Sequence, residues 1–289
     1  MALREVHSGY VLFGNRPHAV YSLLPHFKPG LMLDVGAAAG VFTKMMRNRS
    51  SGSRVLAFEP FPGNFGYFEK NVGPDPHVTL HRAAVSDRAG EVSFFVSSVV
   101  EGKEPGWEEY PGYSSLGFIV DEKSPKAKSS IKVSAVTLDD QVSEHVRFCK
   151  IDVQGGETNV LRGADKLIRA HGVDIFYIEF SGEEPILAFL HERGYVFYDN
   201  VYLLVANRNK PCDEHWKVEK RVAISTGKEA YNAWPRSAPR PFTDYCAWVR
   251  EQTKQIGGVW TDMVCVHQSF VSEFLYAAAE AMRAAANKT

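Results

Sequence analysis

Three polar side chains, those of Lys150, Asp152 and Gln154, alternate with apolar residues near the middle of the chain. Alternate residues of a β-strand lie on one face, so these side chains are expected to share a face. Charged groups are costly to bury alone, so we expect Lys150 and Asp152 to neutralise one another or to pair with another acid. The candidates are Glu157 and Glu179. Two interpretations stay open: Asp152 binds or deprotonates a hydroxyl group, or it forms a purely structural ion pair.

The two further acids differ in their expected roles. Glu157 opens a predicted helix, where the helix dipole favours a carboxylate, so a structural role is the stronger interpretation. Glu179 ends the next predicted strand and is placed to face the same cleft. Functional and structural roles are equally consistent with that position. The candidate catalytic residues are therefore Asp152, Glu179 and Lys150.

A second candidate site is the glycine-containing turn Asp34–Gly40, which joins an apolar strand to the start of a helix. Gly36 lets the backbone turn sharply, and both Gly36 and Gly40 permit a ligand to approach closely. The helix that begins near Gly40 directs free N–H groups at that ligand. Glu59 follows the second predicted strand, where an acid accepts hydrogen bonds from a ribose diol. The pattern favours a cofactor that contains a nucleoside over a purely structural turn.

The same turn argues against a dinucleotide. Ala38 stands where the fingerprint for a pyrophosphate has its middle glycine. S-adenosylmethionine (SAM) has no pyrophosphate, and a carboxylate at Asp34 suits the amino group of its methionine moiety. The turn therefore favours SAM over a nicotinamide cofactor.

The elements that must position these residues alternate between short β-branched runs and longer helical patterns, which is typical of parallel strands joined by crossover helices. The expected strands are Leu31–Val35, Arg54–Phe58, Val78–Val85, Val146–Val153, Val173–Phe180 and Val201–Ala206. The expected helices are 40–49, 61–72, 156–170 and 184–193. The fold class predicted is a doubly wound, Rossmann-like α/β sheet.

Two further strands are expected at Glu91–Ser97 and Ile131–Val136, as a hairpin-like addition at a sheet edge. Between them, residues 99–130 are rich in Gly and Pro and carry Trp107, Tyr110 and Tyr113. A loop of this length is usually functional or disordered. We expect this loop to bind the acceptor and to close over the cleft; the alternative is a solvated, mobile loop.

The alternation stops after residue 207. Residues 208–265 show no clear period, and residues 269–286 form an amphipathic helical pattern. That helix lacks a basic polar face, so we expect it to pack within the protein or in a homodimer rather than on a membrane. The expected organisation is an N-terminal lead-in (1–30), a cofactor-binding domain (31–207, with the inserted loop) and a C-terminal extension (208–289).

The composition of the chain excludes several classes of function. The 289 residues carry a formal net charge of −1, which gives no electrostatic argument for nucleic acid. No signal peptide and no membrane-spanning run is visible. The four cysteines have no metal-ligand spacing and indicate free thiols in a reducing compartment. We expect a soluble cytoplasmic protein without a metal site, in which Asp139 and Asp140 cap a helix after Thr137.

Several short segments occur in one order along residues 31–205. They are Asp34–Gly40, Phe58–Pro60, Ala83–Asp87, Ser114–Leu116, Thr137–Asp140, Lys150–Glu157 and Tyr177–Glu179. This string closely resembles the FkbM family of SAM-dependent methyltransferases. The resemblance implies a seven-stranded Rossmann-like fold, SAM as cofactor and methylation of hydroxyl groups, commonly on sugars or polyketide-type natural products.

The resemblance also implies roles for individual residues. Asp34, Gly36 and Gly40 would surround the methionine part of the cofactor, and Glu59 would bind its ribose. The adenine edge would lie against Ser86 and Asp87.

Two positions depart from the family pattern. Ala38 stands where the family usually has Asn, which removes a polar contact. Gln154 stands where the family usually has Glu, which removes a negative charge beside the expected reaction centre and places any base or metal role of that position in doubt.

The sequence therefore predicts a SAM-dependent methyltransferase, with a hydroxyl group of a small molecule such as a sugar as the acceptor. Three alternatives stay open: an amine or carboxyl acceptor, a nicotinamide-dependent oxidoreductase, and a SAM-binding module without activity. A turnover assay separates the last alternative from the first.

Overall fold

The computed structural model describes residues 19–97, 99, 112–114, 116–180, 183–199 and 261–286. The chain divides into two compact units, of which one comprises Pro29–Val173 and the other joins the N-terminal residues up to Lys28 to the chain from Asp174 onward. Among the described residues, no helix combines the length and hydropathy that a bilayer crossing requires.

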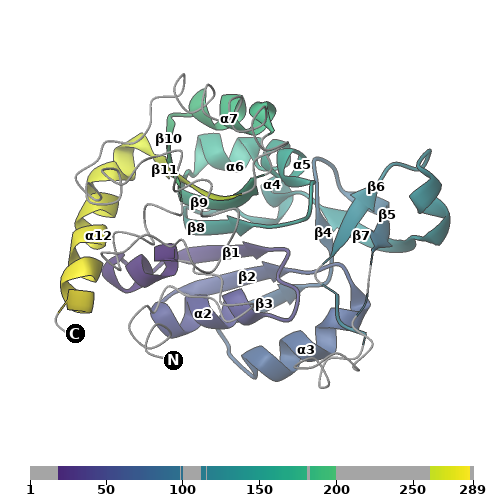
Figure 1. The fold of residues 1–289 in the computed structure, drawn as a ribbon, viewed down its shortest axis with the longest axis horizontal. Helices are drawn as coiled ribbons and strands as arrows, with labels where there is room; N and C mark the ends of the chain where they lie inside the picture. Colours follow the sequence, from purple (N-terminus) through teal and green to yellow (C-terminus); the bar gives the residue numbers. More distant parts are fainter. Residues whose placement is uncertain are drawn as a thin grey trace. The chain divides into compact units, whose positions relative to one another are not determined.

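The unit Pro29–Val173 is built on parallel strands with helices on both faces (Figure 1). Its parallel strands, in the order β8-β1-β2-β3, are β8 (Val146–Ile151), β1 (Leu31–Val35), β2 (Arg54–Phe58) and β3 (Val78–His81). Its helices are α2 (Val41–Arg49), α3 (Pro62–Val72), α4 (Leu138–Gln141), α5 (Glu157–Arg162) and α6 (Asp165–Ala170). Strand β1 is buried along its whole length, as expected for a central parallel strand.

A second sheet of four strands belongs to the same unit, in the order β4-β7-β5-β6. The strands are β4 (Ala84–Val85), β7 (Ile131–Val136), β5 (Gly90–Val96) and β6 (Gly117–Val120), and the 3₁₀ helix η3 (Pro125–Ser129) precedes β7. Phe94 and Val133 lie in a small apolar core of this sheet, against which Phe61, Val96 and Ile119 pack. This core gives the sheet an apolar face of its own.

The other unit contains an antiparallel arrangement. Strand β11 (Thr261–His267) pairs antiparallel with both β9 (Val173–Phe180) and β10 (Tyr195–Asp199). The remaining elements are η2 (Ala19–His26), α7 (Glu184–His191), η4 (Gln268–Phe270) and α12 (Val271–Ala286). Aromatic contacts join η2 and the residue after it to distant parts of the chain, since Tyr21 meets Tyr177 edge-on and Phe27 meets Phe270.

The strand order of the main sheet confirms the predicted fold class. In the unit Pro29–Val173 the strands follow the order β8-β1-β2-β3, and in the other unit β11 lies between β10 and β9 and runs opposite to both. The order reverses between β1 and β8, and ligands of doubly wound folds bind at such a switch point. The first residues to examine are therefore those at the carboxyl ends of β1 and β8.

Several predicted boundaries are wrong. The single strand expected at Val78–Val85 is two strands, β3 and β4, in different sheets. The expected hairpin at a sheet edge is instead a separate sheet, and part of the expected loop 99–130 is the strand β6. Strand β11 was not expected, because the segment before it has no clear period. The strand expected at Val201–Ala206 lies outside the described residues.

The helix expected at 156–170 is divided into α5 and α6. The break lies at Gly163, where an added Cβ would sit 2.0 Å from the carbonyl oxygen of Ser86. Close packing on a distant turn therefore interrupts a segment whose sequence has a continuous helical period.

Candidate functional site

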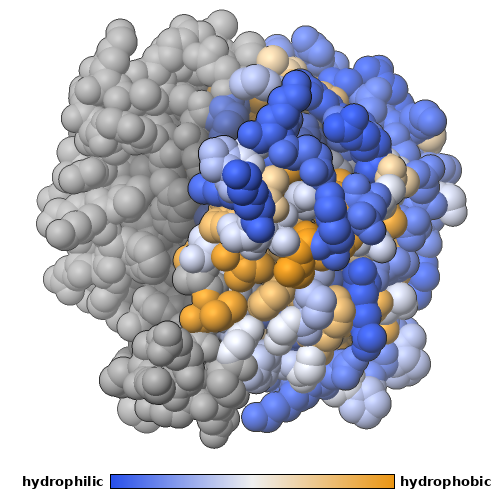
Figure 2. Space-filling model, turned by 90° about the vertical axis from the view of Figure 1, so that its right-hand side faces the viewer, coloured by the Kyte–Doolittle hydropathy of each residue, from blue (hydrophilic) through white to orange (hydrophobic). Residues whose placement is uncertain are grey.

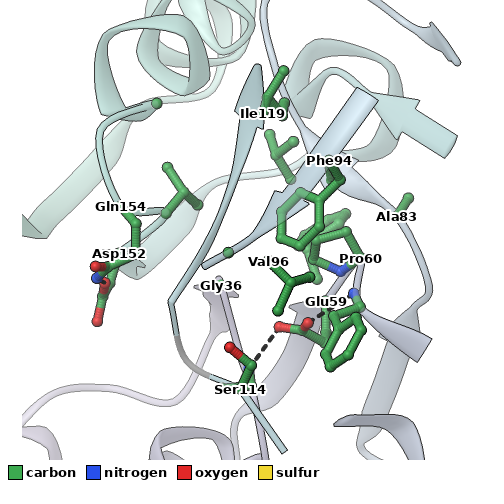
Figure 3. A pocket seen from close by; sticks show the side chains of 18 residues that line it. Gly36, Glu59, Pro60, Ala83, Phe94, Val96, Ser114, Ile119, Asp152 and Gln154 are labelled. Atoms are coloured by element: carbon green, nitrogen blue, oxygen red, sulfur yellow. Dashed lines mark hydrogen bonds between the residues drawn. The ribbon is translucent and has the colours of Figure 1, made fainter. Parts of the chain in front are cut away.

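A pocket opens in the unit Pro29–Val173, at the carboxyl ends of β1, β2 and β8 (Figure 3). Its polar lining comes from Glu59, Ser114, Asp152 and Gln154. Its apolar lining comes in part from the second sheet, through Phe94, Val96, Gly117 and Ile119. Figure 2 shows the side of the molecule that lies at the right of Figure 1. Hydrophobic residues cluster there and are surrounded by hydrophilic ones. The pocket thus has one polar and one apolar wall.

The turn after β1 has little room at two positions. Gly36 has φ +81°, and an added Cβ would lie 1.9 Å from the carbonyl oxygen of Asp152. Gly40 has φ +76°, and an added Cβ would lie 2.8 Å from the ring of Phe68. The left-handed backbone and the close approach both require glycine. The structure therefore gives a physical reason for the two glycines that the sequence singles out.

Three consecutive backbone N–H groups of this turn, those of residues 36–38, already have partners within the protein. Gly36 and Ala37 both donate to the carbonyl oxygen of Phe58, at 3.0 and 2.9 Å. Ala38 donates to Oε2 of Glu59 at 2.8 Å. A pyrophosphate needs free N–H groups at this position. The turn fits a nucleoside cofactor without a pyrophosphate, which agrees with the sequence argument.

Glu59 is 4% exposed and lines the pocket. Its Oε1 accepts hydrogen bonds from the backbone of Phe61 (2.8 Å) and from Nδ2 of Asn64 (3.1 Å), and its Oε2 accepts one from Ala38. Burial raises the pKa of Glu59 to about 7, although these hydrogen bonds and the charge of Lys150 oppose that shift. A carboxylate oxygen accepts about two hydrogen bonds, so Oε2 retains room for one hydroxyl.

Asn64 is a buried residue of the site that the sequence argument missed. It is 1% exposed, and its side chain contacts both Glu59 and the backbone of Ser114. Asparagine in the first turn of a helix carries no distinctive sequence signal, so only the fold reveals its position.

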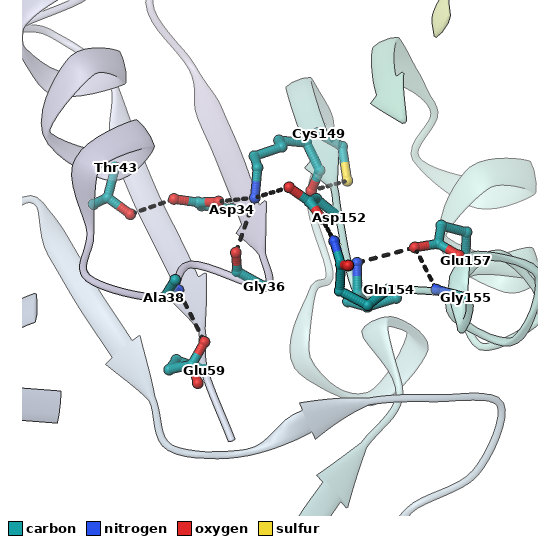
Figure 4. A network of polar contacts seen from close by, with 12 residues as sticks. Asp34, Gly36, Ala38, Thr43, Glu59, Cys149, Asp152, Gln154, Gly155 and Glu157 are labelled. Atoms are coloured by element: carbon teal, nitrogen blue, oxygen red, sulfur yellow. Dashed lines mark hydrogen bonds and ion pairs between the residues drawn. The ribbon is translucent and has the colours of Figure 1, made fainter. Parts of the chain in front are cut away.

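Lys150 lies at the centre of a polar network (Figure 4). Its Nζ is 3.3 Å from Oδ1 of Asp34 and 3.8 Å from Oδ2 of Asp152, and it donates to the carbonyl oxygen of Gly36 at 2.9 Å. The ammonium also lies 4.9 Å from the centroid of the Phe42 ring. The expected pair of Lys150 with Asp152 is present, and the second carboxylate is Asp34.

The two carboxylates beside Lys150 differ in their access to the pocket. Asp34 is fully buried and accepts a hydrogen bond from Thr43 at 2.6 Å. Asp152 is 31% exposed and lines the pocket, and its Oδ1 accepts a hydrogen bond from Nε2 of Gln154 at 2.8 Å. Asp152 can therefore contact a ligand directly. Asp34 does not line the pocket, and its contact with the methionine part of the cofactor stays a prediction.

The two positions at which the sequence departs from the family pattern share a left-handed backbone conformation. Ala38 and Gln154 have φ +48° and +60°, and both line the pocket. Asparagine tolerates this left-handed region better than alanine does. The structure thus gives Ala38 a conformational cost that the usual Asn would reduce.

The other candidates lie at different places. Glu157 is buried at the start of α5 and accepts hydrogen bonds from the backbone of Val153 and Gly155, at 3.0 and 3.2 Å. Burial raises the pKa of Glu157. Glu179 lies in β9 opposite Asp262 of β11, in the other unit, so its catalytic role stays a prediction.

The residues assigned to the adenine edge do not line the pocket. Ser86 is buried and donates to Asp87 at 3.3 Å, and Asp87 is exposed. The pocket is lined here by the preceding residues Ala83, Ala84 and Val85. The role of Ser86 and Asp87 in cofactor binding stays a prediction.

The aromatic residues of the inserted loop are described only in part. Tyr113 is 3% exposed and its ring meets that of Tyr67 edge-on, at 6.2 Å between centroids. Trp107 and Tyr110 lie outside the described residues, and with them most of the predicted lid. Among the described residues, no group of three or more His, Cys, Asp and Glu side chains is arranged to hold a metal ion.

Comparisons with known proteins agree with the geometry. The model of the Methyltransferase FkbM domain matches residues 34–197. Methyltransferase 1 of Beauveria bassiana is 27% identical over 159 residues, which cover 50% of this chain and 62% of that protein. The 2-O-methyltransferase NoeI of Sinorhizobium fredii is 25% identical over 170 residues, which cover 57% of this chain and 68% of that protein.

Among solved structures, the methyltransferase FkbM from Methylobacillus flagellatus is 15% identical with a TM-score of 0.36. The likeness covers 62% of this chain and 47% of that one. The chain thus spans less than two thirds of the length of the fungal relative and about half of this bacterial protein.

Proposed function

This chain belongs to the FkbM methyltransferase family, and we propose that it transfers a methyl group to a hydroxyl oxygen of a sugar or another small natural product. SAM is its cofactor, and it supplies a methyl carbon made electrophilic by the adjacent sulfonium. The turn at Gly36 and the carboxylate of Glu59 would hold this cofactor, as their fit to a nucleoside without a pyrophosphate indicates.

The observation that carries the proposal is the position of Asp152. Its carboxylate lines the pocket while Gln154 and Lys150 hold it from two sides, at 2.8 and 3.8 Å. A carboxylate so placed accepts a hydrogen bond from the acceptor hydroxyl and orients its oxygen. Attack of that oxygen on the methyl carbon would break the carbon–sulfur bond and release S-adenosylhomocysteine, and Asp152 would take the hydroxyl proton, which becomes acidic as the new bond forms.

Positioning supplies much of the expected rate enhancement. Holding two reacting groups in productive geometry is worth roughly 7–11 kcal/mol. Lys150 contributes to this positioning because it ties the cofactor turn, through the carbonyl oxygen of Gly36, to the carboxylate of Asp152.

The charge of the site favours a hydroxyl over a carboxyl acceptor. Asp34 and Asp152 carry two negative charges beside the single positive charge of Lys150. A carboxylate acceptor would lie beside the carboxylate of Asp152, which lines the pocket, and would have no proton to donate to it. The name of the relative NoeI, a 2-O-methyltransferase, supports the same choice. We also propose that the enzyme uses no metal and acts on a small molecule rather than on nucleic acid.

The test is a turnover assay with purified protein and SAM. Glycosides and other polyhydroxylated compounds are compared with analogues in which an amine or a carboxyl group replaces the hydroxyl. We expect release of S-adenosylhomocysteine (SAH) and a methylated product only with hydroxyl acceptors. Methylation of the amine analogues alone would reject the proposed acceptor, and no turnover with any acceptor would favour the module without activity.

Two variants test the role of Asp152 in that assay. Asp152→Asn keeps the shape of the side chain but removes the proton acceptor, so we expect kcat to fall by about 100-fold or more. Glu144→Gln is the control, because Glu144 is 51% exposed and pairs with Arg54 at the amino ends of the strands. An Asp152→Asn enzyme with wild-type kcat would exclude Asp152 as the base.

A further inference from the structure

In the first turn of α3, the side chain of Asn64 forms two hydrogen bonds with the backbone of Ser114, as a neighbouring β-strand would. Nδ2 of Asn64 donates to the carbonyl oxygen of Ser114 at 2.7 Å, and Oδ1 of Asn64 accepts from the backbone N–H of Ser114 at 3.0 Å. Asn64 and Ser114 are separated by 50 residues in sequence. One amide thus satisfies both backbone groups of a residue that lines the pocket.

The same amide also holds Glu59. Nδ2 of Asn64 donates to Oε1 of Glu59 at 3.1 Å. An asparagine side chain has two N–H donors and one carbonyl acceptor, and all are used here. Asn64 does not line the pocket itself, so a bound ligand would not compete for these hydrogen bonds.

Two neighbouring contacts strengthen the attachment of this segment to α3. An added Cβ at Gly63 would lie 2.7 Å from the carbonyl oxygen of Gly112, so the two backbones meet closely. One turn further along α3, Tyr67 meets Tyr113 edge-on. Positions 63, 64 and 67 of one helix therefore each contact one residue of the segment 112–114.

We propose that Asn64 is a positioning residue that fixes the carboxylate of Glu59 and the Ser114 wall of the pocket in a single arrangement, so that binding of the cofactor ribose depends on Asn64. This inference rests on the proposed function only through its cofactor. The hydroxyl acceptor can be wrong while the role of Asn64 holds.

The electrostatics of Glu59 make this role measurable. Only ionised Glu59 offers a charged acceptor to a ribose hydroxyl, so cofactor affinity should fall as the pH drops through the pKa of Glu59, about 7. Donation by Asn64 and the charge of Lys150, on β8, both lower this pKa. Loss of the Asn64 donor should therefore move the fall in affinity to higher pH.

The experiment measures binding of SAH by calorimetry between pH 6 and pH 9. Asn64→Asp keeps the shape of the side chain but turns the bonds to Glu59 and to the Ser114 carbonyl into contacts between acceptors. We expect SAH to bind about tenfold more weakly at pH 7, or worse, with the fall in affinity shifted to higher pH. Asn64→Ala should shift it in the same direction by less, because it adds no charge.

The control is Ser53→Ala, at the opposite end of β2. Ser53 is 1% exposed and accepts a hydrogen bond from the backbone of Gly30 at 3.1 Å. This variant should lose stability yet keep the wild-type pH profile of SAH binding. If the aspartate variant does not fold, Asn64→Ala and Asn64→Ser, whose smaller side chains leave room for water, provide the same comparison.

Each outcome is decisive. Wild-type affinity and pH profile in the folded Asn64 variants would reduce Asn64 to a structural residue and overturn the proposal. Failure of the wild-type protein to bind SAH would overturn it as well, together with the cofactor site. If wild type binds SAH, the Asn64 variants bind it more weakly with the shifted pH profile, and no hydroxyl acceptor is methylated, the proposed acceptor is rejected and the role of Asn64 is supported.

Discussion

Two neighbouring sites in this protein offset the energetic cost of burying a carboxylate in different ways. Asp34, near the end of β1, and Asp152, just after β8, share the ammonium of Lys150. After β2, Glu59 is held by neutral N–H groups, and the pKa of its carboxyl rises to about 7 because burial outweighs those donors. The first site is held together by opposite charges, whereas the second is free to change its charge near neutral pH.

The difference assigns different tasks to the two sites. A carboxylate paired with a buried ammonium is fixed in place, as an anchor for a turn or for a reacting hydroxyl requires. A carboxylate held by neutral donors binds a ligand with a strength that depends on pH. Substitutions that change the charged group or its partners at either site test this difference.

The largest effect is expected from Lys150→Met. The substitution leaves Asp34, which is fully buried, without its cation. Breaking a buried ion pair from one side typically costs about 3–5 kcal/mol. We expect the free energy of unfolding, measured in urea, to fall by that amount, and the double variant with Asp34→Asn to recover most of it.

Arg169→Met is the matched control for that measurement. Arg169 forms an exposed ion pair with Asp165 on α6, and exposed pairs contribute little to stability. Equal losses in the Lys150 and Arg169 variants would show that the charge of Lys150 is not what stabilises the first site.

The second effect concerns Glu59 and pH. Its pKa is raised from 4.5 to about 7 in the folded protein, so between these values the folded state holds a proton that the unfolded state has lost. Stability from this group is therefore present at low pH and falls as the pH rises through this window, by on the order of 3 kcal/mol.

Glu59→Gln isolates this contribution. The difference in unfolding free energy between wild type and Glu59→Gln should decline as the pH rises from 4.5 to 8, since only wild type carries the titrating group. Glu69→Gln, at an exposed position of α3, should reproduce the wild-type profile. A pH-independent difference between wild type and Glu59→Gln would contradict the raised pKa and the contrast between the two sites.

The smallest effect is expected from Ala38→Asn, at the junction of the two sites. Asparagine adopts the φ of +48° found at Ala38 with less strain, so unfolding should require up to about 1 kcal/mol more. Ala127→Asn in η3, where φ is not positive, should give no such gain. Thermal unfolding of the two variants, compared with wild type, measures the difference.

Much of this arrangement follows from local sequence. The apolar runs at Leu31–Val35 and Arg54–Phe58 predict the strands β1 and β2 with the bounds observed. Gly36, Gly40 and Glu59 can be recognised as a cofactor turn because a sharp turn and an acid after the second strand have few other uses in this fold. The periodicity of a strand or a helix depends on residues that are close in sequence, so the sequence alone is enough to predict it.

Other elements depended on distant parts of the chain. Strand β11 has a weak pattern of its own and is stabilised by pairing with β9 and β10 on both sides. The helical period of 156–170 is interrupted because Gly163 packs on the carbonyl of Ser86. In both cases the secondary structure is determined by tertiary packing rather than by the local sequence pattern.

The sequence by itself determined the alternation of strands and helices, the cofactor turn and the residues Lys150, Asp152 and Glu59. The pair of Lys150 with Asp152 was also predicted, but only the tertiary structure decided the further partners, Asp34 for Lys150 and Asn64 for Glu59. Asp34 meets Lys150 because the register of β1 and β8 sets them directly opposite each other. Asn64 meets Ser114 across 50 residues of sequence. Such partners are chosen by register and helix placement, which depend on the free energy of the whole fold rather than on the residues nearby.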